Sequence, residues 1–219
     1  MKAFVAGATG ETGRRIIEQL VQRNIPVRAL VRDRDKAQQI LPTAAELVVG
    51  DVLNIDSVRS AIGDCTVLLS ATGASPSFDP TGPYKVDYEG TKNLVDVAKE
   101  KNIEQFVMVS SLCASKLLHP LNLFFLILVW KKRAEEYLQG SGVPYTIVRP
   151  GGLTNDDQNT DAIVMSSADT LFDGRIARAK VAQVCAEALA DPSAKNKIVE
   201  IIAQAEAPTR DFAELFASV

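Results

Sequence analysis

One glycine-rich stretch decides the fold of this chain: Ala6-Gly7-Ala8-Thr9-Gly10-Glu11-Thr12-Gly13. It directly follows a short apolar run and opens a segment whose apolar residues have helical spacing. Gly7 is expected to make the tight turn out of the strand, and Gly10 to leave room for a diphosphate against the backbone. Gly13 is expected to let the helix pack closely on a sheet. The stretch therefore predicts a strand, a turn and a helix in immediate succession.

The same stretch predicts a dinucleotide site. Backbone amides at the start of a helix face bound phosphate groups, and the helix dipole favours negative charge there. Thr9 and Thr12 add hydroxyl donors, and Glu11 opens the helix. A glycine-rich turn alone is a weak signal, but this one has the strand before it and the helix after it that the motif requires.

Strands and helices alternate along the rest of the chain. Apolar runs predict strands at Ala3–Ala6, Val27–Val31, Glu46–Val49, Val67–Ala71, Phe106–Val109, Tyr145–Val148 and Ile198–Ile202. Their continuous hydrophobicity indicates burial on both faces, which is typical of parallel sheets. We therefore expect an α/β fold with a doubly wound, Rossmann-like parallel sheet. The expectation is a single domain over residues 1–219 with a minimal C-terminal substrate lobe.

Two stretches interrupt this alternation. Ser75–Tyr84 holds three of the ten prolines, and Gly151–Arg175 is polar and weakly periodic. Both follow a predicted strand, and such loops line the ligand crevice of an open parallel sheet. Plain surface loops are the alternative. We interpret residues 151–178 as a substrate-side loop. The acidic residues within it are interpreted as a flexible lid, and no metal is expected because their spacing lacks the pattern of a calcium loop: Asp156, Asp157 and Asp161, with Asn155 and Asn159.

The end of the second strand favours NADP(H) as the cofactor. Folds that bind NAD place an acid there for the ribose hydroxyls, whereas this strand ends in Arg32. An arginine binds a 2′-phosphate through charge-assisted contacts. Arg14 and Arg15 are expected to approach the same phosphate. The neighbouring Asp33 keeps NAD(H) as an alternative.

Composition excludes several classes of function. The chain of 219 residues has 24 Lys and Arg against 27 Asp and Glu, a net charge of −3, so it lacks the basic excess of a nucleic-acid-binding protein. His119 is the single histidine, which disfavours a serine hydrolase or a zinc site. The three distant cysteines, Cys65, Cys113 and Cys185, are expected to be buried free thiols. No targeting segment precedes the first strand, which predicts a cytoplasmic location, and no apolar run is long enough to be a transmembrane segment.

The longest apolar run, Leu121 to Trp130, is interrupted only by Asn122. A core helix is the preferred interpretation. The alternatives are that Phe124, Phe125 and Trp130 wall a pocket for a flat substrate, or that the run makes a peripheral contact with a membrane or a protein partner. His119, just before it, is interpreted as a loop residue rather than a proton donor.

Further motifs follow at regular intervals: Val49–Val52, Ser70–Ala74, Val86–Leu94, Val109–Ser111, Lys131–Glu135 and Arg149–Leu153. With these motifs the chain resembles the short-chain dehydrogenase/reductase superfamily, specifically its atypical NADP-binding branch. Within that branch it is most similar to plant and cyanobacterial proteins related to the dehydrogenase-like subunit of the chloroplast import complex. Flavin or biliverdin reductase-like and NmrA-like proteins are more distant relatives.

The resemblance implies a role for each matching position. Asp51 and the amide of Val52 would contact adenine, and the residues after the fourth strand would line the adenosine ribose and the diphosphate: Ala71, Thr72 and Gly73. Lys131 would hold the nicotinamide ribose. The residues beside the nicotinamide would be Pro150, Gly151, Gly152 and Leu153. Ser111 is similar to the active-site hydroxyl of the family, with Ser110 as the alternative.

The chain departs from the superfamily at one decisive position. The usual acid is a tyrosine four residues before the lysine, and Ile127 stands there. The ordinary reduction of a ketone, which needs that proton donor, is therefore not expected. One hypothesis is a reductase that passes hydride from NADPH to a small-molecule acceptor such as a flavin, a quinone or another flat molecule. The other is a non-catalytic NADP(H)-binding redox sensor or scaffold that regulates a protein partner.

Overall fold

The computed structural model describes residues 1–74 and 79–219, so residues 75–78 of the proline-rich loop lie outside the described part. All the expected strands form: β1 (Ala3–Ala6), β2 (Val27–Val31), β3 (Glu46–Val49), β4 (Val67–Ser70), β5 (Gln105–Val109), β6 (Tyr145–Pro150) and β10 (Lys197–Gln204). They are parallel, in the order β3-β2-β1-β4-β5-β6-β10. The order in which strands are added to the sheet reverses between β1 and β4, and this reversal opens a crevice at the carboxyl ends of the two strands.

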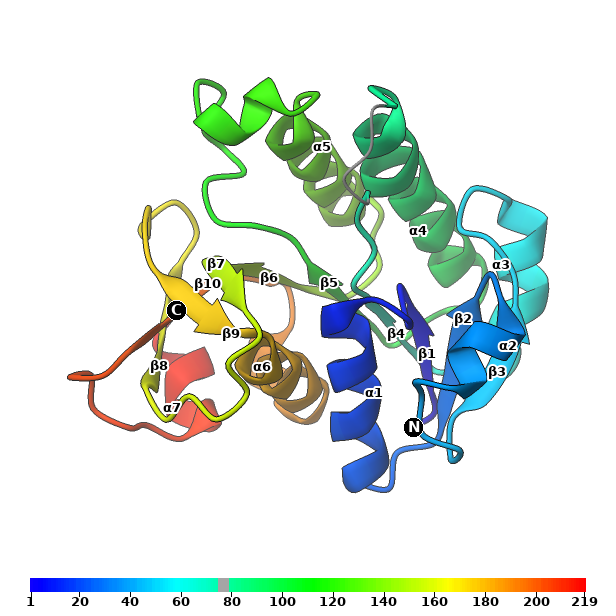
Figure 1. Cartoon of the computed structure of the whole chain (residues 1–219), viewed down its shortest axis with the longest axis horizontal. Helices are drawn as coiled ribbons and strands as arrows, with labels where there is room; N and C mark the ends of the chain where they lie inside the picture. The colour runs from blue at the N-terminus through cyan, green and yellow to red at the C-terminus, as the bar shows by residue number, and fades with distance from the viewer. Residues whose placement is uncertain (75–78) are drawn as a thin grey trace.

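Helices cover both faces of the sheet (Figure 1). On one face lie α1 (Glu11–Gln22), α6 (Arg178–Ala190) and the short α7 (Phe212–Ala217); on the other lie α3 (Ile55–Ile62), α4 (Gly90–Glu100) and α5 (Ile127–Gly140). Short elements join them: α2 (Arg34–Gln38), the π-helix η1 (Tyr84–Glu89) and the 3₁₀ helices η2 (Pro120–Leu123) and η3 (Pro192–Ala194). The doubly wound arrangement expected from the sequence is confirmed.

Successive residues of one strand enter two different cores. In β1, Ala3 and Val5 pack with α1, whereas Phe4 and Ala6 pack on the side of α4. All four side chains are fully buried, which explains why the strand reads as a continuous apolar run. Each large apolar side chain buried this way stabilises the fold by about 1.5–3 kcal/mol.

The expectation that residues 151–178 form one continuous loop is wrong. The segment contains three strands, β7 (Gly152–Thr154), β8 (Ala162–Ser167) and β9 (Arg175–Ala177). β8 pairs antiparallel with β10 from Val199↔Ser167 to Gln204↔Ala162. β9 also pairs with β10, and β7 pairs with β9. Much of the segment expected to be a loop is therefore an extension of the sheet.

The preferred interpretation of the run from Leu121 to Trp130 is also wrong. α5 begins only at Ile127, after η2 and two residues with left-handed backbone, Phe125 and Leu126. Asn122 explains the break, because its side-chain carbonyl accepts hydrogen bonds from the amides of Leu128 (3.0 Å) and Val129 (3.3 Å). An asparagine that binds the first amides of a helix fixes where it starts.

This arrangement leaves the beginning of the apolar run exposed. Leu123 is 86% exposed and Phe124 is 66% exposed, whereas Leu128 is buried. The three cysteines are buried and free, as expected. Among the described residues, no helix combines the length and the apolar character needed to span a membrane.

Candidate functional site

The glycine-rich turn lies where the strand order reverses, between β1 and β4. Gly7 has φ +74°, and a Cβ on it would lie 2.5 Å from the carbonyl oxygen of Ala71, so only glycine fits. A Cβ on Gly13 would lie 2.1 Å from the carbonyl oxygen of Gly7. Gly10 is the N-cap of α1 and provides no side-chain partner for the first amides of the helix. These amides are therefore available to an anionic ligand.

A cavity of about 430 Å³ extends from this turn toward β2 and β3. Nine of the expected cofactor residues line it: Gly7, Thr9, Gly10, Arg32, Asp51, Val52, Ala71, Thr72 and Gly73. Arg32 is exposed at the end of β2. The carboxylate of Asp33 instead accepts the amide of Lys36 at 3.1 Å and caps α2. Of this neighbouring pair, Arg32 is thus the residue that lines the cavity.

The expectation that Arg14 and Arg15 approach the same phosphate is wrong. Arg14 forms an ion pair with Glu11 at 2.6 Å, and Arg15 pairs with Asp157 at 2.6 Å. Neither arginine lines the cavity near Arg32. Hydrogen bonding from Arg15 lowers the pKa of Glu11, with smaller contributions from the charges of Arg14 and Arg178. Arg15 thus joins α1 to the chain between β7 and β8, whereas the ion pair of Arg14 stays within α1.

A second cavity, of about 770 Å³, begins at the same turn and extends toward β5 and β6. It shares Gly10, Ala71, Thr72 and Gly73 with the first cavity. The other expected residues on it are Glu11, Thr12, Ser111, Lys131, Pro150, Gly151, Gly152 and Leu153. Gly13 lines neither cavity, because it packs against Gly7, and Arg14 and Arg15 line neither as well. A larger cavity, of about 870 Å³, lies beside β3 and contains none of the expected site residues.

Lys131 reaches the second cavity from α5. Its ammonium lies 2.8 Å from Oδ1 of Asp87, which η1 contributes. Oδ2 of Asp87 accepts the amide of Ala74 at 3.1 Å, so this carboxylate connects the lysine with the chain that follows β4. Sequence reasoning missed Asp87, although it lies within the motif Val86–Leu94.

The two neighbouring serines point to different partners. Ser110 is buried and donates a hydrogen bond to Glu135 at 2.6 Å. Ser111 is half-buried and donates only to the carbonyl of Leu112, at 3.1 Å; both serines line the second cavity. Of the two, the Ser111 hydroxyl is therefore the one that can turn to a ligand.

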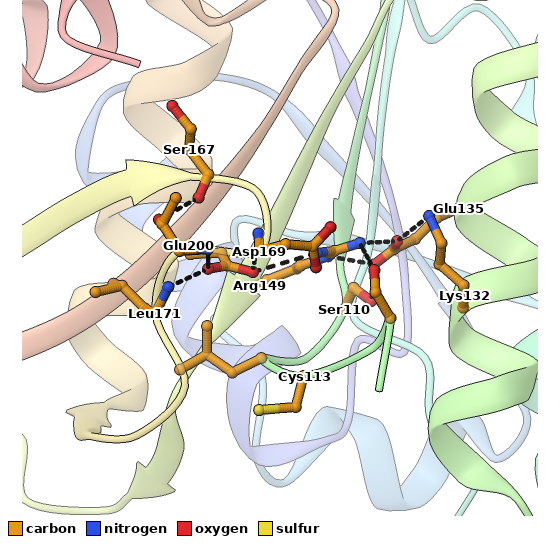
Figure 2. Close-up of polar contacts among 12 residues, drawn as sticks. Ser110, Cys113, Lys132, Glu135, Arg149, Ser167, Asp169, Leu171 and Glu200 are labelled. Atoms are coloured by element: carbon orange, nitrogen blue, oxygen red, sulfur yellow. Dashed lines mark hydrogen bonds and ion pairs between the residues drawn. The ribbon is translucent and has the colours of Figure 1, made fainter. Parts of the chain in front are cut away.

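A buried ionic cluster lies beside this cavity (Figure 2). The guanidinium of Arg149, fully buried in β6, contacts Glu135 at 2.7 Å, Glu200 at 3.2 Å and Asp169 at 2.9 Å. Burial acts to lower the pKa of Arg149, but the carboxylates of Glu135 and Glu200 outweigh it and raise that pKa above its ordinary value. The arginine remains charged and joins α5, β6 and β10.

Glu200 also holds the turn between β8 and β9. Its two carboxylate oxygens accept the amides of Asp169 (2.9 Å), Thr170 (3.0 Å) and Leu171 (2.7 Å). The next residues along the chain, Phe172 to Gly174, line the second cavity. One buried carboxylate therefore fixes a wall of the site. Sequence reasoning missed this role, since Glu200 appears only as a single acid within a predicted strand.

None of the described residues that line the second cavity is a tyrosine. Ile127, at the position of the usual acid, packs beside Leu112 and Leu128. Tyr88 lies against Trp130 with ring centroids 5.9 Å apart, and Tyr137 donates a hydrogen bond to Asp96. His119 does line the cavity, with Nδ1 accepting the amide of Leu121.

A family model described as NAD(P)H-binding matches residues 7–192 of the chain. The chain belongs to this NAD(P)H-binding family. Among relatives, it is 47% identical to an uncharacterised chloroplastic protein of Arabidopsis thaliana, covering 100% of this chain and 82% of that protein. It is 31% identical to sanguinarine reductase of Eschscholzia californica, covering 100% of this chain and 96% of the reductase.

Another relative in this NAD(P)H-binding family is the chloroplastic protein TIC 62 of Pisum sativum. The two are 39% identical over 94% of this chain, which spans only 43% of the length of TIC 62. Among solved structures, a Bacillus halodurans protein described as an NAD-dependent epimerase/dehydratase has a TM-score of 0.88. It is 24% identical, and the match covers 100% of both chains. This likeness supports the Rossmann-like fold.

The location expected from the sequence is corrected by these comparisons. The Arabidopsis and pea relatives are both chloroplastic proteins. The expectation of a cytoplasmic protein is therefore wrong. It rested on the residues before the first strand alone.

Proposed function

We propose that the protein is an NADPH-dependent reductase of a flat, electron-poor acceptor such as a flavin or a quinone. The observation that carries this proposal is the second cavity, where Lys131 and Ser111 meet the Gly151–Leu153 segment with no tyrosine among the described lining residues. Bound NADPH supplies a hydride. Lys131 holds the nicotinamide ribose, and Ser111 donates a hydrogen bond to the acceptor. The acceptor gains two electrons with the hydride and takes its proton from water.

The absence of the phenol suits such an acceptor. A ketone becomes an alkoxide as hydride arrives, and it needs an acid in the transition state. A flavin or a quinone delocalises the added charge, so orientation of the two rings contributes more than a strong acid does. The similarity to sanguinarine reductase over nearly its whole length supports a reductase.

NADPH is proposed as the preferred cofactor. The exposed guanidinium of Arg32 lines the cavity proposed for adenosine, where it would bind a 2′-phosphate. Asp33, the residue that favoured NADH, caps α2 instead. The remaining cofactor residues keep the roles that the resemblance implies.

The proposal is tested by NADPH oxidation with a panel of flavins, quinones and carbonyl compounds. Native protein is expected to reduce flavins or quinones and not simple ketones. Lys131→Ala and Ser111→Ala should each lower the rate at least tenfold. Lys99→Ala on α4 and Ser60→Ala on α3, which lie away from the cavity, are matched controls. Absence of turnover with every acceptor would reject the enzyme.

The second candidate is an NADP(H)-dependent sensor that binds a protein partner without turnover. Two observations favour it: Ile127 replaces the acid, and the exposed residues Leu118 and Leu123 lie close to Leu121, which lines the cavity. The relation to TIC 62 is compatible with such a role. The test is partner capture from a plastid extract with and without NADPH, and capture that depends on NADPH, together with no turnover, would favour the sensor over the enzyme.

A further inference from the structure

Two arginines line the second cavity at β9 and α6, near the place proposed for the acceptor, and neither has a role in the proposed reaction. Arg175 is exposed at the start of β9, and Arg178 is half-buried at the start of α6. Strand pairing places Arg175 opposite Gly152, and a Cβ on that glycine would lie 3.5 Å from Cγ of Arg175. Gly152 is one of the four residues proposed to lie beside the nicotinamide. Arg175 therefore stands next to the place where an acceptor would meet the cofactor.

Among the described residues, no carboxylate forms an ion pair with either arginine, although the charge of Arg178 acts on Glu11. The ion pairs of the described residues include Arg14, Arg15, Arg23, Arg28, Arg59, Arg149 and Arg210, but not Arg175 or Arg178. Arg178 donates one hydrogen bond to the side-chain oxygen of Asn155, at 2.9 Å. The nearby carboxylate of Glu11 is already bound by Arg14 and Arg15. This end of the cavity therefore carries excess positive charge.

The carboxylates on the cavity offset this excess only in part. Asp173 also lines it and keeps its negative charge while its Oδ1 accepts the amide of Gly174 at 2.7 Å, so one carboxylate stands against two arginines. The first turn of α6 carries no acid, whereas α1, α3 and α7 each begin with one. A cation at the start of a helix is electrostatically unfavourable, and Glu11, which also pairs with Arg14 and Arg15, compensates Arg178 only in part. A bound anion would complete the compensation of both arginines.

We propose that Arg175 and Arg178 form a specificity site for an anionic group, a phosphate or a carboxylate, carried by the acceptor. The site rests on the proposed reductase function and narrows its substrate class to flat acceptors with an anionic side chain. Arg175 makes the main contact because it is beside Gly152. Arg178 contributes from the side of the glycine-rich turn, where the diphosphate of the cofactor would be the competing anion.

FMN and riboflavin provide the test, because they share the reacting ring and differ in one phosphate. With native protein and saturating NADPH, FMN is expected to have a KM about tenfold lower than riboflavin. Arg175→Gln and Arg178→Gln should each remove most of that difference by raising the KM for FMN, with the KM for riboflavin unchanged. Arg133→Gln, which changes an exposed arginine on α5 away from the cavity, is the matched control.

A binding measurement separates this inference from the proposed function. Each flavin is titrated with the complex of the protein and NADP⁺, in which no turnover occurs, and binding is followed by the quenching of flavin fluorescence. The titration is done with the native and the variant proteins. Tighter binding of FMN than riboflavin, lost in the variants, supports the site even if no reduction is seen. Equal binding of both flavins, or of neither, overturns it. A loss of NADPH affinity in Arg175→Gln as large as the loss for FMN also overturns it, because the arginine would then serve the cofactor.

Discussion

The ammonium of Lys131 lies 2.8 Å from a carboxylate oxygen of Asp87, and the aspartate is only 2% exposed. The pair joins α5 to the π-helix η1, two elements that the sequence separates by more than a full strand and helix. A buried carboxylate requires such a partner, because an unpaired charge there would be costly. Asp87 therefore fixes where the lysine of the proposed site can reach.

Asp87→Asn tests this dependence. The amide cannot balance the ammonium, so Lys131 is expected to leave its position, and kcat should fall about tenfold with a smaller rise in the NADPH KM. Steady-state rates measure both. Asp96→Asn, which instead removes the partner of Tyr137, is the control. Unchanged rates in Asp87→Asn would show that the lysine is positioned without the carboxylate.

Arg32→Ala tests the choice of cofactor. Loss of the guanidinium should weaken NADPH binding about tenfold or more and leave NADH binding nearly unchanged, because only NADPH has the 2′-phosphate. Titration of cofactor fluorescence gives both dissociation constants. Arg34→Ala, an exposed arginine that does not line this cavity, should change neither. Equal weakening of the two cofactors by Arg32→Ala would contradict the NADP preference.

Arg149→Met tests the buried ionic cluster. The substitution keeps much of the volume but leaves Glu135 and Glu200 buried without their shared cation. The free energy of unfolding should fall by about 3–5 kcal/mol, as measured by urea denaturation. The triple variant Arg149→Met, Glu135→Gln, Glu200→Gln should recover part of the loss. A single variant as stable as the native protein would mean that the carboxylates are not held by this arginine.

Glu200→Gln tests the turn that Glu200 holds. The glutamine side chain has one acceptor oxygen where the glutamate has two. The backbone amides of Asp169, Thr170 and Leu171 therefore cannot all keep their hydrogen bonds. Hydrogen exchange of these amides should become at least tenfold faster, while those of β1 stay protected. Glu187→Gln, which loses only the partner of Arg23, is the comparison. Unchanged exchange rates in the turn would show that contacts other than those of Glu200 hold its backbone in place.

The buried thiol of Cys185 is expected to make the folded protein less stable at alkaline pH. Burial raises the pKa of this thiol from 9.0 to about 12. Between these two values the unfolded chain releases the thiol proton and the folded chain keeps it, so the free energy of unfolding falls as pH rises. Urea midpoints from pH 8 to 10.5 measure the slope, which should be shallower in Cys185→Ala. Parallel slopes for the two proteins would exclude this thiol as a source of the pH dependence.

The cofactor half of the molecule was predictable from local patterns. The glycine spacing requires particular backbone geometry at Gly7 and Gly13, and continuous apolar runs require burial on both faces of a sheet. Such signals are contained in a few consecutive residues. They therefore locate a strand or a turn without any knowledge of what packs against it.

The acceptor half depended on partners that are distant in sequence. β8 is a strand because β10 pairs with it, and its run Ile163 to Met165 was too short to be decisive among polar neighbours. The run from Leu121 was misread because one asparagine side chain, rather than average hydrophobicity, determines where α5 begins. Arg175 and Arg178 gave no signal either, since an arginine without a carboxylate partner is visible only in three dimensions.

The position of β10 has a consequence for the order in which the protein is made. This strand lies between β6 on one side and β8 and β9 on the other, yet it is the last strand in the described chain. During synthesis from the N-terminus, β1 to β6 have their partners before residue 197 emerges from the ribosome, whereas β8 and β9 must wait for it. We therefore expect a nascent chain to acquire its nucleotide-binding half first, and its acceptor wall only when synthesis is nearly complete.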